Sequence, residues 1–225
     1  MAVWIGCIFL VGVIAYFLGA VPTGYWLGKL VKDIDIRQHG SHSTGATNVL
    51  RTLGRMPALI TLVIDLLKGV AAIAFARWFY SLPVVAATKP PSIDQAAWLP
   101  WAIAVSAILA ILGHSRSVWV RFTGGKSAAT GLGVLLATYW PVGLGVAISF
   151  MVGLIVSRIV SLSSICAAIA AVILMAAFHQ PTAYLLLASI GAVYVILRHR
   201  ANIQRLLSGK EPRIGRGKDD DYVAL

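Results

Sequence analysis

The stretch from Ile159 to Leu197, IVSLSSICAAIAAVILMAAFHQPTAYLLLASIGAVYVIL, contains no Asp, Glu, Lys or Arg over 39 residues. A run this long and apolar is typical of a chain that crosses a bilayer, because about 20 apolar residues make one helical span. As one straight helix it would extend about 58 Å, roughly twice the hydrocarbon core. Since His179-Gln180-Pro181 interrupts the run near its middle, we expect two short spans, 164–178 and 182–197.

The whole chain has the composition of a membrane protein. Of its 225 residues 59% are hydrophobic, 12% are charged, and the mean hydropathy is +0.84. That charged share is about half of what a soluble domain carries. The net charge of +11 could indicate nucleic-acid binding, but in a membrane protein basic residues gather in the loops on the inner side. The distribution of charge therefore decides between the two interpretations.

Five further apolar stretches bring the expected number of transmembrane helices to seven. The second long uncharged run, 127–157, has Pro141-Val142-Gly143 near its middle and is expected to form two short spans. Pro57 precedes another span, at a position where helices often begin. The five expected spans are 3–28, 57–80, 96–113, 127–141 and 143–157.

Charge indicates how these spans are oriented. With the N-terminus outside, sixteen of the nineteen Lys and Arg residues fall on the inner side, as the positive-inside rule requires. A nucleic-acid partner is therefore not expected. A five-span arrangement would also keep most charge inside, so span length favours seven. We expect an all-α integral membrane protein with a cytoplasmic C-terminus. Residues 1–215 form its single domain, 201–207 an amphipathic surface helix, and 216–225 a disordered tail.

The first polar cluster is a Gly/Ser/Thr-rich segment that runs from Gly40 to Arg51. A short helix from about Ala46 to Leu53, stopped by Gly54, would direct its N-terminus at this segment. Open backbone amides beside an arginine favour an anion site over an ordinary loop.

The second cluster, Gly124-Gly125-Lys126-Ser127, has the ending of a nucleotide-binding P-loop. The P-loop motif needs a glycine five positions before Gly125, where this chain has Val120. Flexible glycine amides and a lysine beside a helix start still suit a phosphate. A lysine that simply ends a membrane span is an equally good interpretation of this motif alone.

Two more clusters follow on the expected inner side. Ser161-Leu162-Ser163-Ser164 could bind a ligand or cap a helix, and capping is favoured. His199 and Asn202 are three residues apart, so they share a helix face in the stretch before Glu211. A basic stretch touching anionic lipid is the alternative for this fourth cluster. Asp65 and Lys68 lie inside the second span and are expected to pair, because intramembrane charges are costly.

Several common chemistries have no motif in this sequence. No histidine is followed by Asp five positions later, there is no nucleophile elbow, and Cys and His show no metal-ligand spacing. No metal ion or cofactor is therefore expected. An enzyme with this sequence would have to work without an obvious strong base.

Together and in this order, the clusters resemble the PlsY family of bacterial acyl-phosphate:glycerol-3-phosphate acyltransferases over about residues 18–215. The motifs that carry the resemblance are Pro22-Thr-Gly-Tyr25, Gly45-Ala-Thr-Asn-Val-Leu-Arg51, Asp65-Leu-Leu-Lys-Gly69, Leu112-Gly-His114, Gly124-Gly-Lys126, Ser161-Leu-Ser-Ser-Ile165 and Arg198-His-Arg-Ala-Asn-Ile-Gln-Arg-Leu-Leu207. Two motifs depart from it, at His42, Ser43 and Ser127: the family's Gly-Ser-Gly-Asn is Gly40-Ser41-His42-Ser43 here, and its Gly-Gly-Lys-Gly is Gly124-Gly125-Lys126-Ser127.

The resemblance implies acyl transfer from acyl phosphate to the sn-1 hydroxyl of glycerol 3-phosphate, giving lysophosphatidic acid and phosphate. The reaction would be substrate-assisted, at the cytoplasmic face of the bacterial inner membrane. Membrane lipid and the enzyme that forms acyl phosphate are the further expected partners. The groups expected to be catalytic are Ser41, Asn48, Lys126 and His199. Those expected to bind substrate are Gly40, Gly45, Thr47, Arg51, Gly124, Gly125, Ser127, Ser164, Asn202 and Glu211.

Two other functions fit parts of the pattern. A transporter of an anion or phosphorylated metabolite would need polar residues near the bilayer midplane. Only Asp65 and Lys68 are expected at depth, and the other clusters lie at one face, which favours an enzyme. A purely structural membrane subunit would leave four anion-suited clusters without a purpose.

Overall fold

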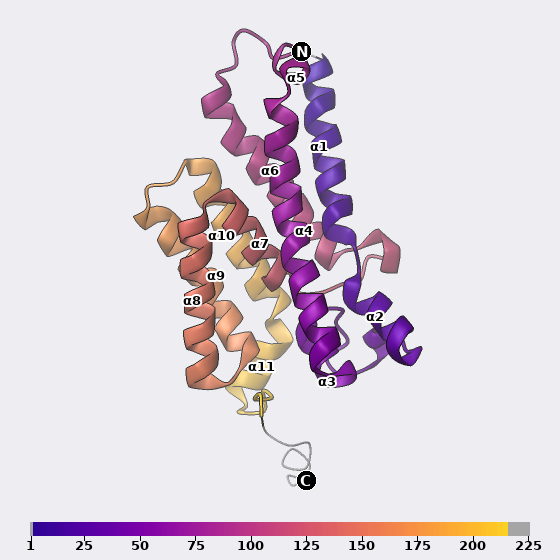
Figure 1. Cartoon of the computed structure of the whole chain (residues 1–225). Helices are drawn as coiled ribbons and strands as arrows, with labels where there is room; N and C mark the ends of the chain where they lie inside the picture. The colour runs from indigo at the N-terminus through magenta and orange to yellow at the C-terminus, as the bar shows by residue number, and fades with distance from the viewer. Residues whose placement is uncertain (1, 216–225) are drawn as a thin grey trace.

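The computed structural model describes residues 2–215, and the tail predicted to be disordered, 216–225, lies outside them. Across the described residues the chain forms eleven α-helices and two short 3₁₀ helices, Ile36–Gln38 and Val118–Val120, and no β-strand (Figure 1). Five helical segments there are long and apolar enough to cross a membrane, and a bent pair makes a possible sixth. The all-α membrane fold is confirmed.

A short break divides the N-terminal apolar run. Helix α1 (Ala2–Ala20) ends before Pro22, and α2 (Thr23–Lys32) follows it. Val3–Lys32 together remain long and apolar enough for one span, in agreement with the span expected over 3–28. Proline lacks the N–H that would continue the helical hydrogen bonds, which accounts for the break. The carbonyl oxygen of Val21, beside the break, accepts a hydrogen bond from Lys68 Nζ at 3.0 Å.

The next helices follow the sequence pattern closely. Helix α3 (Ala46–Leu53) begins and ends at the predicted residues, and Gly54 after it has a φ of +96°. Helix α4 (Arg55–Ser81) covers the stretch predicted for the second span and holds Pro57 in its first turn, where a missing N–H costs nothing. A single turn, α5 (Pro83–Ala86), precedes α6 (Gln95–Ser115).

The long uncharged runs form helical hairpins, but the breaks and starts differ from those expected. Helix α7 (Ala128–Thr138) gives way to α8 (Trp140–Ser157) at Tyr139, so Gly143 lies inside a helix. A Cβ on Gly143 would lie 2.6 Å from the Leu136 backbone, so it serves close packing. Helix α9 (Val160–Ala177) begins four residues before the predicted start at 164, which places the serine cluster in its first turns.

The chain ends on a bent pair of helices. Helix α10 (Thr182–Arg198) and α11 (Arg200–Leu207) meet at His199 with a bend of 61°. Helix α7, with 11 residues, is shorter than a usual span. The seven-span arrangement and the outside N-terminus therefore remain predictions.

Small residues bring the helices together. A Cβ on Gly69 of α4 would lie 2.3 Å from Thr130 O, and one on Gly133 of α7 would lie 2.0 Å from Leu66 O. Such close backbone approach is the usual means of helix association in lipid, where the hydrophobic effect offers little. Figure 1 shows α1, α4 and α6 side by side, with α7 to α10 packed beside them.

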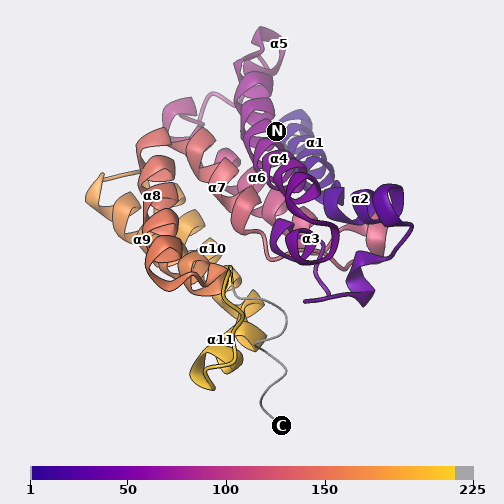
Figure 2. The same ribbon diagram turned by 60° about the horizontal axis from the view of Figure 1, so that its bottom comes forward.

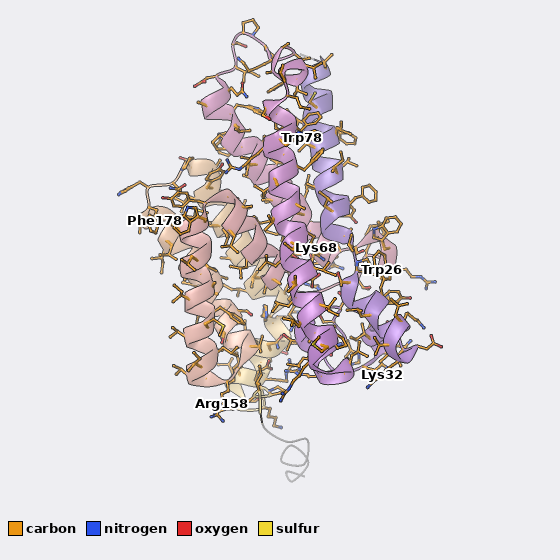
Figure 3. All side chains as sticks on the ribbon, viewed as in Figure 1. Trp26, Lys32, Lys68, Trp78, Arg158 and Phe178 are labelled. Carbon is orange, nitrogen blue, oxygen red and sulfur yellow. The ribbon has the colours of Figure 1, made fainter. Side chains whose placement is uncertain are left out.

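The polar segments gather at one end of this bundle. Figure 1 shows α2, α3 and α11 at the end of the bundle opposite the start of α1, and Figure 2 brings that end forward. Figure 3 shows Lys32 and Arg158 at the same end, with Trp78 toward the other and Lys68 between them. Loops that are distant in the sequence therefore meet at a single face.

Candidate active site

Residues from all four predicted clusters line one cavity. Its lining comes from the loop before α3, from α3 itself, from the start of α7, from α9, and from the region around α11. It continues between α7, α8, α9 and α10, where its walls are apolar. Eleven of the fourteen predicted site residues line it: Ser41, Gly45, Thr47, Asn48, Arg51, Lys126, Ser127, Ser164, His199, Asn202 and Glu211.

The three remaining glycines lie behind the cavity wall. A Cβ on Gly40 would meet Asn48 Oδ1 at 2.3 Å, and Gly40 has a φ of +60°. Gly124 and Gly125 pack against His114, where a Cβ would lie 2.2 Å from its carbonyl oxygen and 2.0 Å from its Nε2 respectively. These glycines shape the loops rather than line the cavity.

Asn48 organises the loop before α3. Its side chain is buried, and its Nδ2 donates to the carbonyl oxygens of Ile36, His39 and Ser43 at 2.8–3.0 Å. Its Oδ1 accepts from the Ser41 backbone N–H at 2.7 Å. Because its amide group is fully engaged, Asn48 fixes the shape of this loop, and its catalytic role remains a prediction.

A chain of polar contacts joins Lys126 to the C-terminal segment. Lys126 Nζ donates to Asn202 Oδ1 at 2.5 Å, and Asn202 Nδ2 donates to Glu211 Oε1 at 2.5 Å. Ser161 Oγ donates to the same Glu211 oxygen, and Arg205 Nε donates to Glu211 Oε2, both at 2.7 Å. Glu211 therefore holds α11 and α9 together beneath the lysine.

The environment of Lys126 lowers its basicity. Burial lowers the pKa of Lys126 to about 8, since a desolvated ammonium is less stable. The negative charge of Glu211 opposes this shift, and the positive charges of Arg205 and Arg51 add to it. For Glu211 itself burial raises the pKa, but its hydrogen bonds outweigh burial and hold the pKa below the usual value.

His199 is held as a neutral imidazole. Its Nδ1 lies 2.7 Å from the carbonyl oxygen of Val195, which can only accept, so Nδ1 carries the proton. Burial lowers the pKa of His199 to about 4, against the effect of that hydrogen bond and with that of the nearby Lys126 charge. Its Nε2 therefore has a lone pair available to accept a hydrogen bond.

A buried ionic cluster supports the glycine loop from inside the bundle. Lys68 Nζ lies 2.8 Å from Asp65 Oδ1, as the predicted pairing requires, and His114 Nδ1 lies 3.6 Å from the same oxygen. The His114 ring rests against Gly125, whose N–H donates to His114 O at 3.3 Å. Gly125 O accepts from Arg198 Nη2 at 3.0 Å, so the peptide before Lys126 is held on several sides.

The two departures from the family pattern share one backbone feature. His42 and Ser127, which replace the family's usual glycines, have φ values of +55° and +64°. These are left-handed conformations that favour glycine, and other residues adopt them at a cost of about 1 kcal/mol. Ser127 Oγ donates to Ile111 O at 2.9 Å and so gains a contact that glycine would lack.

The prediction of site residues missed four polar lining groups. Asp65, for which the sequence predicted only a pairing with Lys68, lines the cavity, and so does His114. Ser161 reaches Glu211, and Ser43 lines the loop side. A buried charge inside a span was the available signal for Asp65.

These features define an integral membrane enzyme with a cationic, phosphate-suited site at the mouth of an apolar cavity. The family model for glycerol-3-phosphate acyltransferases matches residues 9–209, and the chain belongs to this family. A curated relative from Acaryochloris marina, named glycerol-3-phosphate acyltransferase, is 53% identical over 97% of each chain. One from Rhizobium johnstonii, glycerol-3-phosphate acyltransferase 2, is 56% identical over 90% of this chain and 94% of its own.

Solved structures agree with this assignment. The crystal structure of PlsY (YgiH), an integral membrane glycerol 3-phosphate acyltransferase, in its glycerol 3-phosphate form matches with a TM-score of 0.81 and 32% identity. The match covers 92% of this chain and 96% of that one. The lysophosphatidic acid form matches with a TM-score of 0.78 and 31% identity, over 92% and 95% of the two chains. The family resemblance seen in the motifs is confirmed.

Proposed function

We propose that this protein transfers a fatty acyl group from acyl phosphate to the sn-1 hydroxyl of glycerol 3-phosphate, giving lysophosphatidic acid and phosphate. The observation that carries the proposal is the single cavity, which joins a polar, cationic end to an apolar groove. A reaction that attaches an acyl chain to a phosphorylated head group needs both halves in one site. The names of the relatives and the two ligand forms of PlsY support the acceptor substrate.

The polar end has the groups to hold two phosphates. Burial is the main cause of the lowered pKa of Lys126, and Arg205 and Arg51 lie close enough to lower it further. Charge-assisted hydrogen bonds from such groups are strong ligands for phosphate oxygens. We assign Lys126 to the charge that develops on the transferring acyl phosphate. Arg51, Ser164, His199 and Asn202 would then bind glycerol 3-phosphate and orient its hydroxyl, with the backbone of the α3 loop alongside.

The proton of the acceptor hydroxyl needs a base, and His199 is a weak one at a pKa of about 4. A phosphoryl oxygen of the donor can take the proton instead, and it becomes more basic as the bond to the acyl carbon breaks, because negative charge collects on the departing phosphate. In the proposed step the hydroxyl oxygen forms the new ester bond as the acyl carbon–oxygen bond to phosphate breaks. The proton passes to the departing phosphate, while His199 Nε2 accepts a hydrogen bond that orients the hydroxyl. Orientation and charge stabilisation supply most of the rate.

The place of the reaction follows from the same chemistry. Because the polar end gathers the basic residues, we propose that it faces the cytoplasm of a bacterial plasma membrane, with seven spans and the N-terminus outside. Acyl phosphate reactive enough to need no strong base is readily hydrolysed. Direct delivery by the enzyme that makes it is therefore the partner interaction we expect, with membrane lipid as the surrounding solvent.

Purified protein in detergent tests the proposal directly. Palmitoyl phosphate with labelled glycerol 3-phosphate should yield lysophosphatidic acid, and palmitoyl-CoA in its place should not. Absence of product from protein that still unfolds cooperatively would refute the enzyme assignment, and equal use of both donors would refute acyl phosphate as the specific donor. Uptake of glycerol 3-phosphate into proteoliposomes without any acyl donor would instead support the transporter alternative.

A further inference from the structure

Two glycines line the cavity although helix packing does not require them. Gly131 of α7 and Gly191 of α10 both face the cavity, and a Cβ at either would meet no heavy atom within 4 Å. Glycine inside a helix is less stable than alanine by roughly 0.5–1 kcal/mol. At Gly69 and Gly133 close helix contact accounts for that cost, since a Cβ there would lie 2.0–2.3 Å from backbone oxygen. At Gly131 and Gly191 no such contact exists, and the free space belongs to the cavity.

The two glycines lie at different depths. Gly191 comes eight residues before His199, so it lies about 12 Å from the polar end along α10. Gly131 is in the second turn of α7, close to Lys126. Leu187 and Ala188, one turn before Gly191 on the same face of α10, also line the cavity, and both are apolar and buried. The deeper glycine therefore borders the part of the cavity that only the distal portion of a long chain would reach.

We propose that Gly191 determines acyl-chain length by keeping the distal groove open. The inference rests on the proposed function, since it needs the acyl chain of the donor to lie in this groove. A larger side chain at position 191 would fill the groove at that depth. The carbonyl end of the donor, beside Lys126 and His199, would remain undisturbed, so short chains would still react and long chains would not fit.

The steric fit of the acyl chain in the groove determines how strongly a larger residue at position 191 would discriminate between donors. A donor dissolved in lipid or detergent already has apolar surroundings, so transfer from water contributes little to the discrimination. Enzyme pockets discriminate by about 10- to 200-fold against one surplus methylene that does not fit. We therefore expect a change of at least about 10-fold in the ratio of kcat/KM for octanoyl phosphate to that for palmitoyl phosphate.

The test compares Gly191→Leu with a matched control. Gly6 of α1 is also a helical glycine where a Cβ would meet no heavy atom within 4 Å, and it lies outside the cavity lining. Gly6→Leu should keep the wild-type ratio, whereas Gly191→Leu should raise it at least about 10-fold and retain turnover of octanoyl phosphate. Gly191→Ala, which favours the helix, should shift the ratio less and carries the test if the leucine variant fails to fold.

Binding separates this inference from the proposed function. Thermal unfolding with octanoyl and palmitoyl lysophosphatidic acid measures chain discrimination without turnover, because a bound ligand stabilises the folded state. Gly191→Leu should lose the stabilisation by the palmitoyl form and keep that by the octanoyl form. If the wild type makes no product from either donor, the proposed function is overturned and the unfolding shifts decide the inference. Unchanged ratios and shifts in a folded Gly191→Leu protein would overturn the inference alone.

Discussion

Replacing Gly125 by alanine should disable the enzyme through a single methyl group. The new Cβ would lie 2.0 Å from His114 Nε2 and 2.7 Å from Cε1, whereas carbon atoms pack at about 3.5–4.0 Å. One of the two partners must therefore move by about 1.5 Å. His114 is buried beside Asp65, which Lys68 also contacts at 2.8 Å, so its ring has little room to move. The loop that carries Lys126 is the part that yields.

The expected cost has two parts. Overpacking of this kind destabilises a protein by about 1–3 kcal/mol, which a stable bundle tolerates. Displacing a catalytic group by about 1 Å costs roughly 100-fold in rate. Movement of the loop would also strain the hydrogen bonds that Gly125 makes with Arg198 and with His114 O. We therefore expect kcat to fall about 100-fold in a protein that still folds.

A second substitution shows whether the contact is the cause. His114→Ala removes the ring that the new methyl group would strike. The double variant Gly125→Ala/His114→Ala should therefore have a kcat at least about tenfold higher than the two single variants predict when their fold losses are multiplied. Gly124→Ala provides the contrast, because its Cβ would meet the backbone oxygen of His114 at 2.2 Å. His114→Ala cannot relieve that clash. Turnover of palmitoyl phosphate is measured for the wild type, the three single variants and the two double variants that add His114→Ala. Wild-type kcat in Gly125→Ala, or no recovery when His114→Ala is added to it, would refute the reasoning.

Three further predictions concern charge and backbone strain. Lys126→Met should lower kcat by about 10²–10³-fold. Wild-type activity should decline as pH rises through about 8, where the Lys126 ammonium loses its proton. A wild-type rate that pH does not affect up to about 10 would exclude a charged Lys126 from the reaction. Glu211→Gln removes the charge from a buried, hydrogen-bonded carboxylate. It should lower the free energy of unfolding, measured by denaturant titration, by about 1–3 kcal/mol. Wild-type stability in this variant would contradict the role of Glu211 in holding α11 and α9 together. His42→Gly should raise the free energy of unfolding by about 1 kcal/mol and retain activity, because the exposed His42 has a φ of +55°. A lower midpoint of denaturant unfolding in this variant would show that the backbone at His42 is not strained.

Most of the fold could be predicted because a bilayer imposes simple rules. Apolar runs of sufficient length mark helices, and Gly54 fixed the end of α3 at the predicted residue. The differences are local. Pro22 divides the first span into two helices, and Tyr139 ends α7 two residues before the proline that was expected to do so. Proline is tolerated in the first turn of a helix, so Pro141 indicates a start near it but does not fix the break.

The site was predictable for a related reason. Polar side chains are expensive in a membrane protein, so Lys126, His199 and Asn202 stood out against an apolar background, and all three line the cavity. Their individual roles were less accessible. The family resemblance implies a catalytic Asn48, and the structure shows that the hydrogen bonds of its side chain all go to the surrounding loop, Ser41 included. Which partners an amide finds depends on the path of the backbone around it, and no sequence spacing records that path.

The glycines of α7 show most directly which residue roles the sequence alone does not predict. Gly131 and Gly133 are two residues apart in the same apolar helix, so they lie about 200° apart around its axis. Gly133 allows α7 to touch α4, since a Cβ added there would lie only 2.0 Å from Leu66 O, whereas Gly131 borders open cavity. The same residue type in the same helix thus has a packing role on one face and leaves space for a ligand on the other. Only the position of the neighbouring helices distinguishes them, and for that reason the chain-length role proposed for Gly191 had to come from the structure.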